Sequence, residues 1–176
     1  MPLFGRKRQP AARIDPRTQT FTIDGITYPA LGPWAYAPRV PTQFVRIPAQ
    51  SKMEVVGESH YIDGIRRISD AMRAAGADTA LGVFVAEPGN PHDNHAVRID
   101  LLWGGMVETC GHLSREQAYR FQPDVKTLAE KGGLATMRAE IWGGTPGKPH
   151  FGVWLGGDSA DFTRDRMRDA RGGGQS

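Results

Sequence analysis

The sequence has only one cysteine and no long hydrophobic run. Cys110 has no second cysteine to pair with, so the chain holds no disulfide framework of its own. No apolar stretch approaches the roughly 20 residues that a membrane helix needs, and the opening MPLFGRKRQP lacks the apolar centre of a secretory signal. We therefore expect a cytoplasmic protein, kept in a reducing environment, that has no membrane partner.

Motifs of the common enzyme classes are also missing. The Gly-Gly pairs that begin at positions 104, 132, 143 and 156 lack the Lys and Ser or Thr that complete a phosphate-binding loop. Ser59 and Ser114 are available hydroxyls, but neither stands in the G-x-S-x-G elbow of a hydrolase. These patterns give no positive argument for an enzyme, and we expect no catalytic residue and no cofactor.

The charge of the chain is concentrated at its ends. The net charge is +3; residues 1–17 contribute +4 and residues 164–171 contribute +2, which leaves −3 for residues 18–163. We expect a disordered basic arm over 1–17 and a flexible tail over 156–176, which serve solubility or hold a polyanion weakly. If the body between them binds nucleic acid, it does so through a local patch and not through its overall field.

The composition favours a β-rich globular domain, because 22 Gly and 13 Pro supply many turns. Residues 18–52 are predicted to form an ordered extension. FTIDGITY (21–28) alternates around Asp24-Gly25, a pair that favours a type I′ hairpin turn. PALGPWAYAPRVP (29–41) is too rich in proline for a central strand. We expect this second segment to wrap the core, with Trp34 and Tyr36 packed inward.

The pattern from Met53 onward predicts short strands interrupted by helices. One amphipathic helix has apolar residues at helical spacing and a glycine stop: Ile65, Ile68, Met72 and Gly76. Ser114, with Gln117 three residues later, predicts a capped helix, and Pro123 predicts the start of another short helix. Strands are predicted at 53–57, 81–88, 95–103, 106–113, 134–144 and 150–157. This order favours a mainly antiparallel small β-barrel with two or three short helices at its openings.

The stretch EPGNPHDNHAV (87–97) places His92, Asp93 and His95 within four positions, behind a turn. A metal site needs three or four converging ligands, whereas side chains alternate along a strand, which separates His92 from His95. A hydrolytic dyad lacks a recognisable nucleophile. A simpler interpretation is a polar turn, in which Asn90 and Asp93 bond neighbouring backbone amides. We expect no metal site, and a metal-dependent hydrolase stays as a third hypothesis.

Three segments, taken together and in this order, resemble the HIRAN domain: VVGESHY (55–61), VFVAEPGNPHDNHAVRI (83–99) and GHLSREQAYRF (111–121). The resemblance covers residues 53–155. It implies a modified OB- or SH3-like β-barrel of the stand-alone bacterial or phage type. It also implies a DNA repair context, because other members are fused to helicase-like translocases that remodel replication forks. In those members the domain grips single-stranded DNA at a 3′ end.

The resemblance also implies roles for individual residues. Asp93 would accept a hydrogen bond from the terminal 3′-hydroxyl, His92 would pack on a sugar or base, and Asn90 would brace the turn. The remaining nucleic-acid-binding candidates are two residues at the start of the stacking face, one more in the turn and three arginines for phosphate contacts: His60, Tyr61, His95, Arg115, Arg66 and Arg67. The chain has Ser59 and His60 where the DNA-gripping members have a basic residue and an aromatic one.

These observations lead to one main hypothesis and one alternative of another class. The main hypothesis is a non-catalytic module that binds single-stranded DNA or free 3′ DNA ends. The alternative is a protein-interaction or assembly module on the same barrel, which docks a partner through the 18–52 extension and does not bind DNA. The net charge of −3 on residues 18–163 favours the alternative, and the three-segment match favours the first.

Overall fold

The computed structural model describes residues 15–48 and 52–156. Within these ranges the chain is mainly β, with α1 (Ile62–Ala74), α2 (Arg115–Glu130) and a short 3₁₀ helix, η1 (Glu58–His60). The strands are β1 (Phe21–Ile23), β2 (Ile26–Tyr28), β3 (Gln43–Arg46), β4 (Lys52–Glu54), β5 (Ala80–Ala86), β6 (Val97–Trp103), β7 (Met106–His112), β8 (Gly133–Trp142) and β9 (Gly152–Gly156). The prediction of a mainly β chain with two or three short helices is confirmed. Most of the predicted basic arm and C-terminal tail lies outside the described residues.

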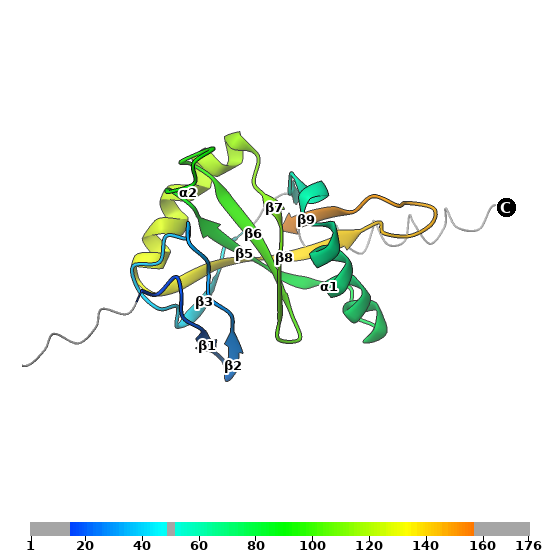
Figure 1. The fold of residues 1–176 in the computed structure, drawn as a ribbon, viewed down its shortest axis with the longest axis horizontal. Helices are drawn as coiled ribbons and strands as arrows, with labels where there is room; N and C mark the ends of the chain where they lie inside the picture. Colours follow the sequence, from blue (N-terminus) through cyan, green and yellow to red (C-terminus); the bar gives the residue numbers. More distant parts are fainter. Residues whose placement is uncertain (1–14, 49–51, 157–176) are drawn as a thin grey trace, which may run out of the picture.

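Seven of the described strands form one sheet, whose order is β4-β9-β8-β5-β6-β7, with β3 also paired to β8 (Figure 1). The pairs are antiparallel except for β3 and β8, which run parallel. β8 is the longest strand. Its first half lies beside β3 and its second half beside β9, while β5 pairs with its other edge. The mainly antiparallel sheet was predicted, but the parallel strand β3 was not.

A single isolated β-bridge connects the two ends of this strand order, which are β4 and β7. Val56, just after β4, and His112, the last residue of β7, exchange two backbone hydrogen bonds of 2.9 Å each. Gly111 makes this approach possible: its φ is 152°, and a Cβ there would lie 2.4 Å from the Val56 carbonyl oxygen. The described strands do not form a continuous closed barrel, so the OB- or SH3-like barrel stays a prediction.

The sheet carries a hydrophobic core on each of its two faces. On one face, both α-helices pack onto buried side chains that include Phe84 and Ala86. On the other face, the β1–β2 hairpin and the Pro-rich segment cover Val83 and Val85. Because side chains alternate along a strand, β5 is buried on both sides, which explains its unbroken apolar sequence.

The N-terminal extension folds largely as its sequence predicts. β1 and β2 pair around Asp24 and Gly25, whose φ values of 53° and 77° are those that a type I′ turn requires. The prediction that Trp34 packs inward is wrong, because this residue is 44% exposed. A turn closed by the Ala35 amide and the Gly32 carbonyl, 3.3 Å apart, turns Trp34 outward and buries Ala35 instead. Tyr36 packs partly against the core, as predicted.

α1 has the predicted amphipathic pattern. Ile65, Ile68 and Met72 are buried, and Gly76 follows the helix end with a φ of 69°. Gly64 lets the first turn approach β7 closely, because a Cβ there would lie 2.6 Å from a carboxylate oxygen of Glu108. No helix among the described residues is long and apolar enough to cross a membrane.

α2 begins as predicted but does not break at Pro123. The Ser114 hydroxyl oxygen accepts a hydrogen bond of 3.3 Å from the Gln117 amide, which is the predicted cap. The predicted second helix is wrong, because one helix runs through the proline. Proline in a helix interior costs about 3 kcal/mol, whereas burying one Val or Leu side chain returns about 1.5–3 kcal/mol. Val125 and Leu128, beyond the proline, pack onto the same core as Ala118 before it.

Candidate functional site

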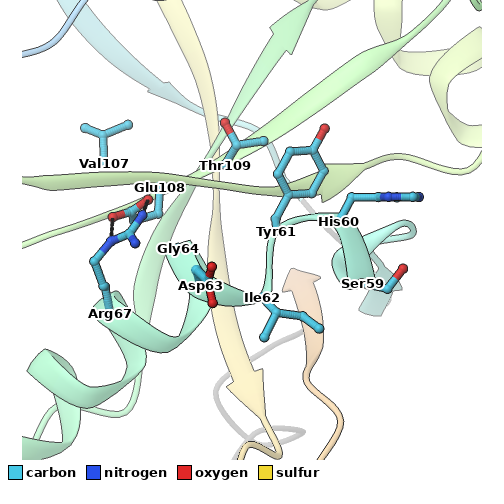
Figure 2. Close-up of a pocket in the computed structure, with 10 residues that line it drawn as sticks. All are labelled: Ser59, His60, Tyr61, Ile62, Asp63, Gly64, Arg67, Val107, Glu108 and Thr109. Atoms are coloured by element: carbon cyan, nitrogen blue, oxygen red, sulfur yellow. Dashed lines mark hydrogen bonds and ion pairs between the residues drawn. The ribbon is translucent and has the colours of Figure 1, made fainter.

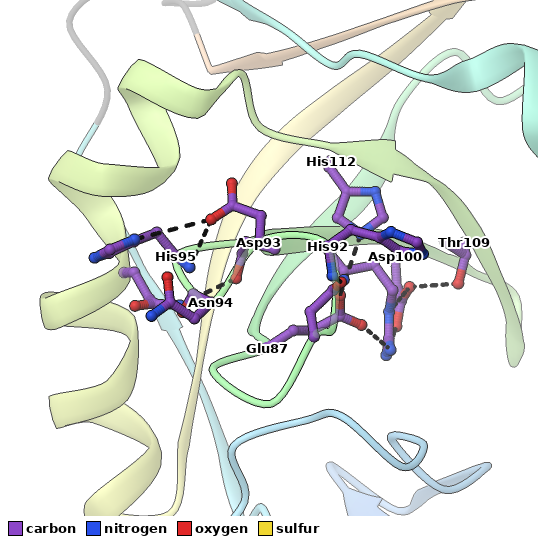
Figure 3. A network of polar contacts seen from close by, with 12 residues as sticks. Glu87, His92, Asp93, Asn94, His95, Asp100, Thr109 and His112 are labelled. Carbon is purple, nitrogen blue, oxygen red and sulfur yellow. Dashed lines mark hydrogen bonds and ion pairs between the residues drawn. The ribbon is translucent and has the colours of Figure 1, made fainter.

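The stretch 87–97 forms a polar turn between β5 and β6 (Figure 3). Asn90 bridges it, because its Nδ2 donates to Glu87 Oε2 at 3.0 Å and its Oδ1 accepts from the His92 amide at 2.9 Å. Asp93 Oδ1 accepts from the His95 amide at 2.8 Å. The prediction that Asn90 and Asp93 bond neighbouring backbone amides is confirmed.

The two histidines of this turn point in different directions. Figure 3 shows His92 on the side of His112 and His95 on the side of α2. The His95 ring lies 5.1 Å from the ring of Tyr119 in α2, and its Nδ1 is 3.8 Å from Asp93 Oδ1. The predicted separation of His92 and His95 is confirmed, and each histidine belongs to a different surface.

Neither a metal centre nor a reactive thiol is assembled in the part of the chain that the structure describes. These residues contain no group of three or more His, Cys, Asp or Glu side chains placed to hold a metal ion. Cys110 is fully buried, and burial raises the pKa of its thiol well above the ordinary value. The Cys110 thiol is therefore not an activated nucleophile.

A buried ion network lies behind the turn. Glu87 is 1% exposed, and its Oε1 accepts from Arg98 Nη1 at 2.8 Å. Arg98 also donates from Nε and Nη2 to the two carboxylate oxygens of Asp100, at 2.9 Å each, and from Nη2 to the Leu31 carbonyl at 2.6 Å. Thr109 Oγ1 donates to Asp100 Oδ1 at 2.8 Å. Paired in this way, the buried charges tie the turn to β6, β7 and the extension.

Neighbouring groups keep Glu87 and Arg98 of this network in their charged forms. Burial alone would raise the pKa of Glu87, but hydrogen bonds from His112 and Asn90 and the charge of Arg98 outweigh burial and lower it. Burial alone would lower the pKa of Arg98, but Asp100 and Glu87 raise it above its ordinary value. Glu87 is therefore ionised at neutral pH and gives the turn a permanent acceptor.

His112 connects this network to the start of α1. Its Nε2 lies 3.2 Å from Glu87 Oε2, and its ring lies 6.3 Å from the Tyr61 ring, measured between centroids. The Tyr61 ring in turn lies 6.5 Å from the His60 ring. Burial and then the charge of Glu87 raise the pKa of the Tyr61 hydroxyl. Three aromatic side chains, from η1, from the residue between η1 and α1, and from β7, thus form a row that leads to the 87–97 turn.

A cleft of about 720 Å³ opens beside Tyr61, between the start of α1 and β7 (Figure 2). It contains three of the predicted site residues: His60, Tyr61 and Arg67. The other residues that line it are Ser59, Ile62, Asp63, Gly64, Val107, Glu108 and Thr109. The predicted turn residues Asn90, His92, Asp93 and His95 do not line this cleft.

The Arg67 guanidinium is paired with the Glu108 carboxylate within this cleft. Its Nε and Nη2 donate to the two carboxylate oxygens of Glu108 at 2.8 and 3.0 Å (Figure 2). These hydrogen bonds raise the pKa of the guanidinium above its ordinary value. A phosphate that approached Arg67 would have to compete with Glu108 for the same donors.

The other two predicted arginines lie elsewhere. The Arg66 guanidinium carbon is 5.3 Å from the centre of the Phe151 ring, and Arg66 does not line the cleft. Arg115 is exposed at the first position of α2, one helical turn before Tyr119. The structure therefore brings His60, Tyr61 and Arg67 together, whereas Arg115 lies one helical turn from Tyr119, the residue that pairs with His95.

Several residues of this region were not among the predicted site residues: Glu87, Arg98, Asp100, Thr109, His112 and Tyr119. A partial signal was present in β6, where Arg98 and Asp100 are two positions apart and therefore share one face of the strand. The pairing of Glu87 with His112 had no such signal, because the two residues are 25 positions apart in the chain.

Comparison of the chain with protein-family models, with curated proteins and with solved structures gives no match.

Proposed function

We propose that the protein is a non-catalytic module that binds single-stranded DNA and favours a free 3′ end. The fold proposed with it is an OB- or SH3-like barrel, in which the bridge between Val56 and His112 joins the ends of the strand path. The observation that carries the proposal is the row of aromatic side chains that runs from Tyr61 through His112 to the 87–97 turn.

A partly exposed row of flat rings suits unpaired bases. Stacking of a base on an aromatic side chain contributes about 1–3 kcal/mol and tolerates any sequence, because every base has a π face. His60 is exposed, and Tyr61 and His112 are partly exposed, so all three rings are accessible. The neighbouring cleft of about 720 Å³ gives room for the terminal nucleotide.

Asp93 suits a terminal sugar hydroxyl. Its Oδ1 accepts from the His95 amide, and among the described residues no donor is bonded to its Oδ2. An ionised carboxylate only accepts hydrogen bonds, so it attracts a free hydroxyl and repels a phosphate at the same position. Asn90 keeps the turn in this shape through its bonds to Glu87 and to the His92 amide.

The alternative, a protein-interaction module, has its own observation. Ile26 and Trp34 of the N-terminal extension are 43% and 44% exposed, although Phe21, Ile23, Tyr28 and Leu31 of the same extension are buried in a core cluster with residues of the sheet. An exposed Trp is a frequent anchor at protein interfaces. If this alternative is right, a Trp34→Ala variant loses self-association or a co-purifying partner, and DNA affinity is absent in both the variant and the wild type.

Fluorescence anisotropy with a labelled dodecamer, single-stranded or as a blunt duplex, tests the proposal. We expect the wild type to bind the single strand more tightly than the duplex. Tyr61→Ala should weaken single-strand binding about 5-fold or more, since stacking contributes about 1 kcal/mol or more. Tyr61→Phe keeps the ring and should bind as the wild type does. Equal binding of both DNA forms, governed by salt alone and unchanged in Tyr61→Ala, would contradict the proposal.

A further inference from the structure

Tyr119 is the most exposed large hydrophobic side chain among the described residues. It lies on α2 and is 67% exposed. A single exposed aromatic residue needs no explanation by itself. Tyr119 differs because its ring is paired: the His95 ring lies 5.1 Å away at an interplanar angle of 49°. The pair forms a surface ledge between α2 and the 87–97 turn.

Hydrogen bonds hold both His95 and the helix that carries Tyr119 in place. On the turn side, Asp93 Oδ1 accepts from the His95 amide at 2.8 Å and lies 3.8 Å from His95 Nδ1. On the helix side, Gln122 is 6% exposed, and its Nε2 donates to the carbonyls of Asn94 and Ala96 at 2.9 and 3.2 Å. The helix and the turn therefore cannot separate without breaking buried hydrogen bonds, and the ledge is preorganised.

The same face of α2 carries a cation beside the ledge. Arg115, Tyr119 and Gln122 follow one another at spacings of four and three, so their side chains share one side of the helix. Gln122 binds the turn, Tyr119 meets His95 above it, and Arg115 is exposed one helical turn further on. A flat apolar surface next to a guanidinium matches a base with its phosphate.

We propose that Tyr119 and His95 form a second base-stacking position, which takes an internal nucleotide of the strand whose 3′ end lies at the Tyr61–His112 row. Arg115 contacts the phosphate of that nucleotide. This inference rests on the proposed function. Figure 3 shows Asp93 with His92 and His112 on one side of it and His95 on the other, and in this proposal one strand crosses the turn and meets both positions. This second stacking position gives the His95 ring a function, whereas the turn uses only the His95 backbone amide and the contact of the ring with Asp93.

Anisotropy titrations with two 3′-hydroxyl oligonucleotides of different length separate the two positions. The first is a labelled dodecamer, and the second is a trinucleotide that competes for the end site alone. We expect Tyr119→Ala to weaken dodecamer binding about 5-fold or more and to leave trinucleotide competition unchanged. Tyr119→Phe should bind both as the wild type does. Trp34→Ala, another exposed aromatic residue removed from the extension, should change neither affinity.

The outcomes distinguish this inference from the proposed function. If the wild type binds the dodecamer and Tyr119→Ala binds it equally well, the second position is overturned and the proposed function stands. If Tyr119→Ala weakens the trinucleotide and the dodecamer by the same factor, Tyr119 acts at the end site and the second position is again overturned. A wild type that binds neither oligonucleotide overturns both proposals. A dimer that Tyr119→Ala dissociates, with unchanged DNA affinity, assigns the ledge to a second copy of the chain.

Discussion

Arg67 and Glu108 show how one ion pair controls the charge of the candidate cleft. Arg67 is 61% exposed and Glu108 is 19% exposed, measured on their side chains, and the two form a bidentate pair. An exposed pair of this kind contributes little to stability. Its larger effect is to occupy the donors that Arg67 would otherwise offer to a phosphate.

We expect Glu108→Gln to increase the affinity for single-stranded DNA, because it releases Arg67 and removes one negative charge from the cleft. An added phosphate contact should steepen the dependence of log affinity on log salt by about 0.7 for a single strand. Anisotropy titrations at several salt concentrations measure both effects. Glu54→Gln, which removes the same charge from an exposed position on β4, is the control. Identical shifts in the two variants would show that only the net charge matters.

The residue scale also shows what a sequence leaves open. The hydrogen bonds of Asn90 and Asp93 to backbone amides within the turn follow from their own chemistry, so the sequence predicted these bonds correctly. Glu108, the partner of Arg67, and His112, one partner of Glu87, lie 41 and 25 positions away in the chain, respectively, on β7. Nothing in the local pattern indicates such pairings, which depend on how α1 and β5 are placed against that strand.

At the scale of elements, the bridge between Val56 and the end of β7 is the contact on which the site depends. It positions His112, which links Tyr61 to Glu87. Gly111 allows this approach, since a Cβ at that position would overlap the Val56 carbonyl oxygen and lie 2.6 Å from a methyl group of Val55.

We expect Gly111→Ala to lower the free energy of unfolding by about 2 kcal/mol or more, because it combines a strained φ with a backbone clash. Urea denaturation followed by circular dichroism measures this change. Gly147→Ala is the matched control: a Cβ there meets nothing within 4 Å, and we expect a change within about 0.5 kcal/mol. A Gly111→Ala protein with the denaturation midpoint of the wild type would show that Val56 and residue 111 can move apart at little cost in free energy.

Elements with a strong local signal were predicted well, and elements fixed by packing were not. The Asp24-Gly25 hairpin and α1 each have their own turn or periodic pattern, and both are present. The exceptions are β3, the helix through Pro123 and the outward Trp34. β3 is short and pairs with a strand about 90 positions away. α2 continues because its buried residues beyond the proline outweigh the lost hydrogen bond.

At the scale of the whole molecule, the two faces of the sheet have different coverings. The N-terminal extension covers one face through Phe21, Ile23, Tyr28 and Leu31. The helices cover the other face, and the cleft, the aromatic row and the Tyr119–His95 ledge lie around these helices and the 87–97 turn. The cleft and the ledge therefore lie next to the two helices, whereas His112 of the row is paired with Glu87, which Arg98 connects to the Leu31 carbonyl of the extension.

The charge distribution sets the kind of DNA binding that the body can support. Residues 18–163 carry a net charge of −3, and the cleft contains Asp63 and Glu108 beside Arg67. Binding driven by a broad positive field is therefore not expected. Under the proposed function, affinity comes mainly from stacking and from hydrogen bonds at the strand end, which depend less on salt than phosphate contacts do.

The most direct test of the central claim compares two strands that differ only at the 3′ terminus. Anisotropy titrations with the same single-stranded dodecamer, ending in a 3′-hydroxyl or a 3′-phosphate, measure what Asp93 contributes. We expect the wild type to prefer the hydroxyl about 10-fold or more, since a hydrogen bond to a charged group contributes about 1.5–3 kcal/mol. Asp93→Asn keeps an acceptor for the His95 amide but removes the charge, so it should reduce that preference. Equal affinity of the wild type for both termini would contradict recognition of a free 3′ end.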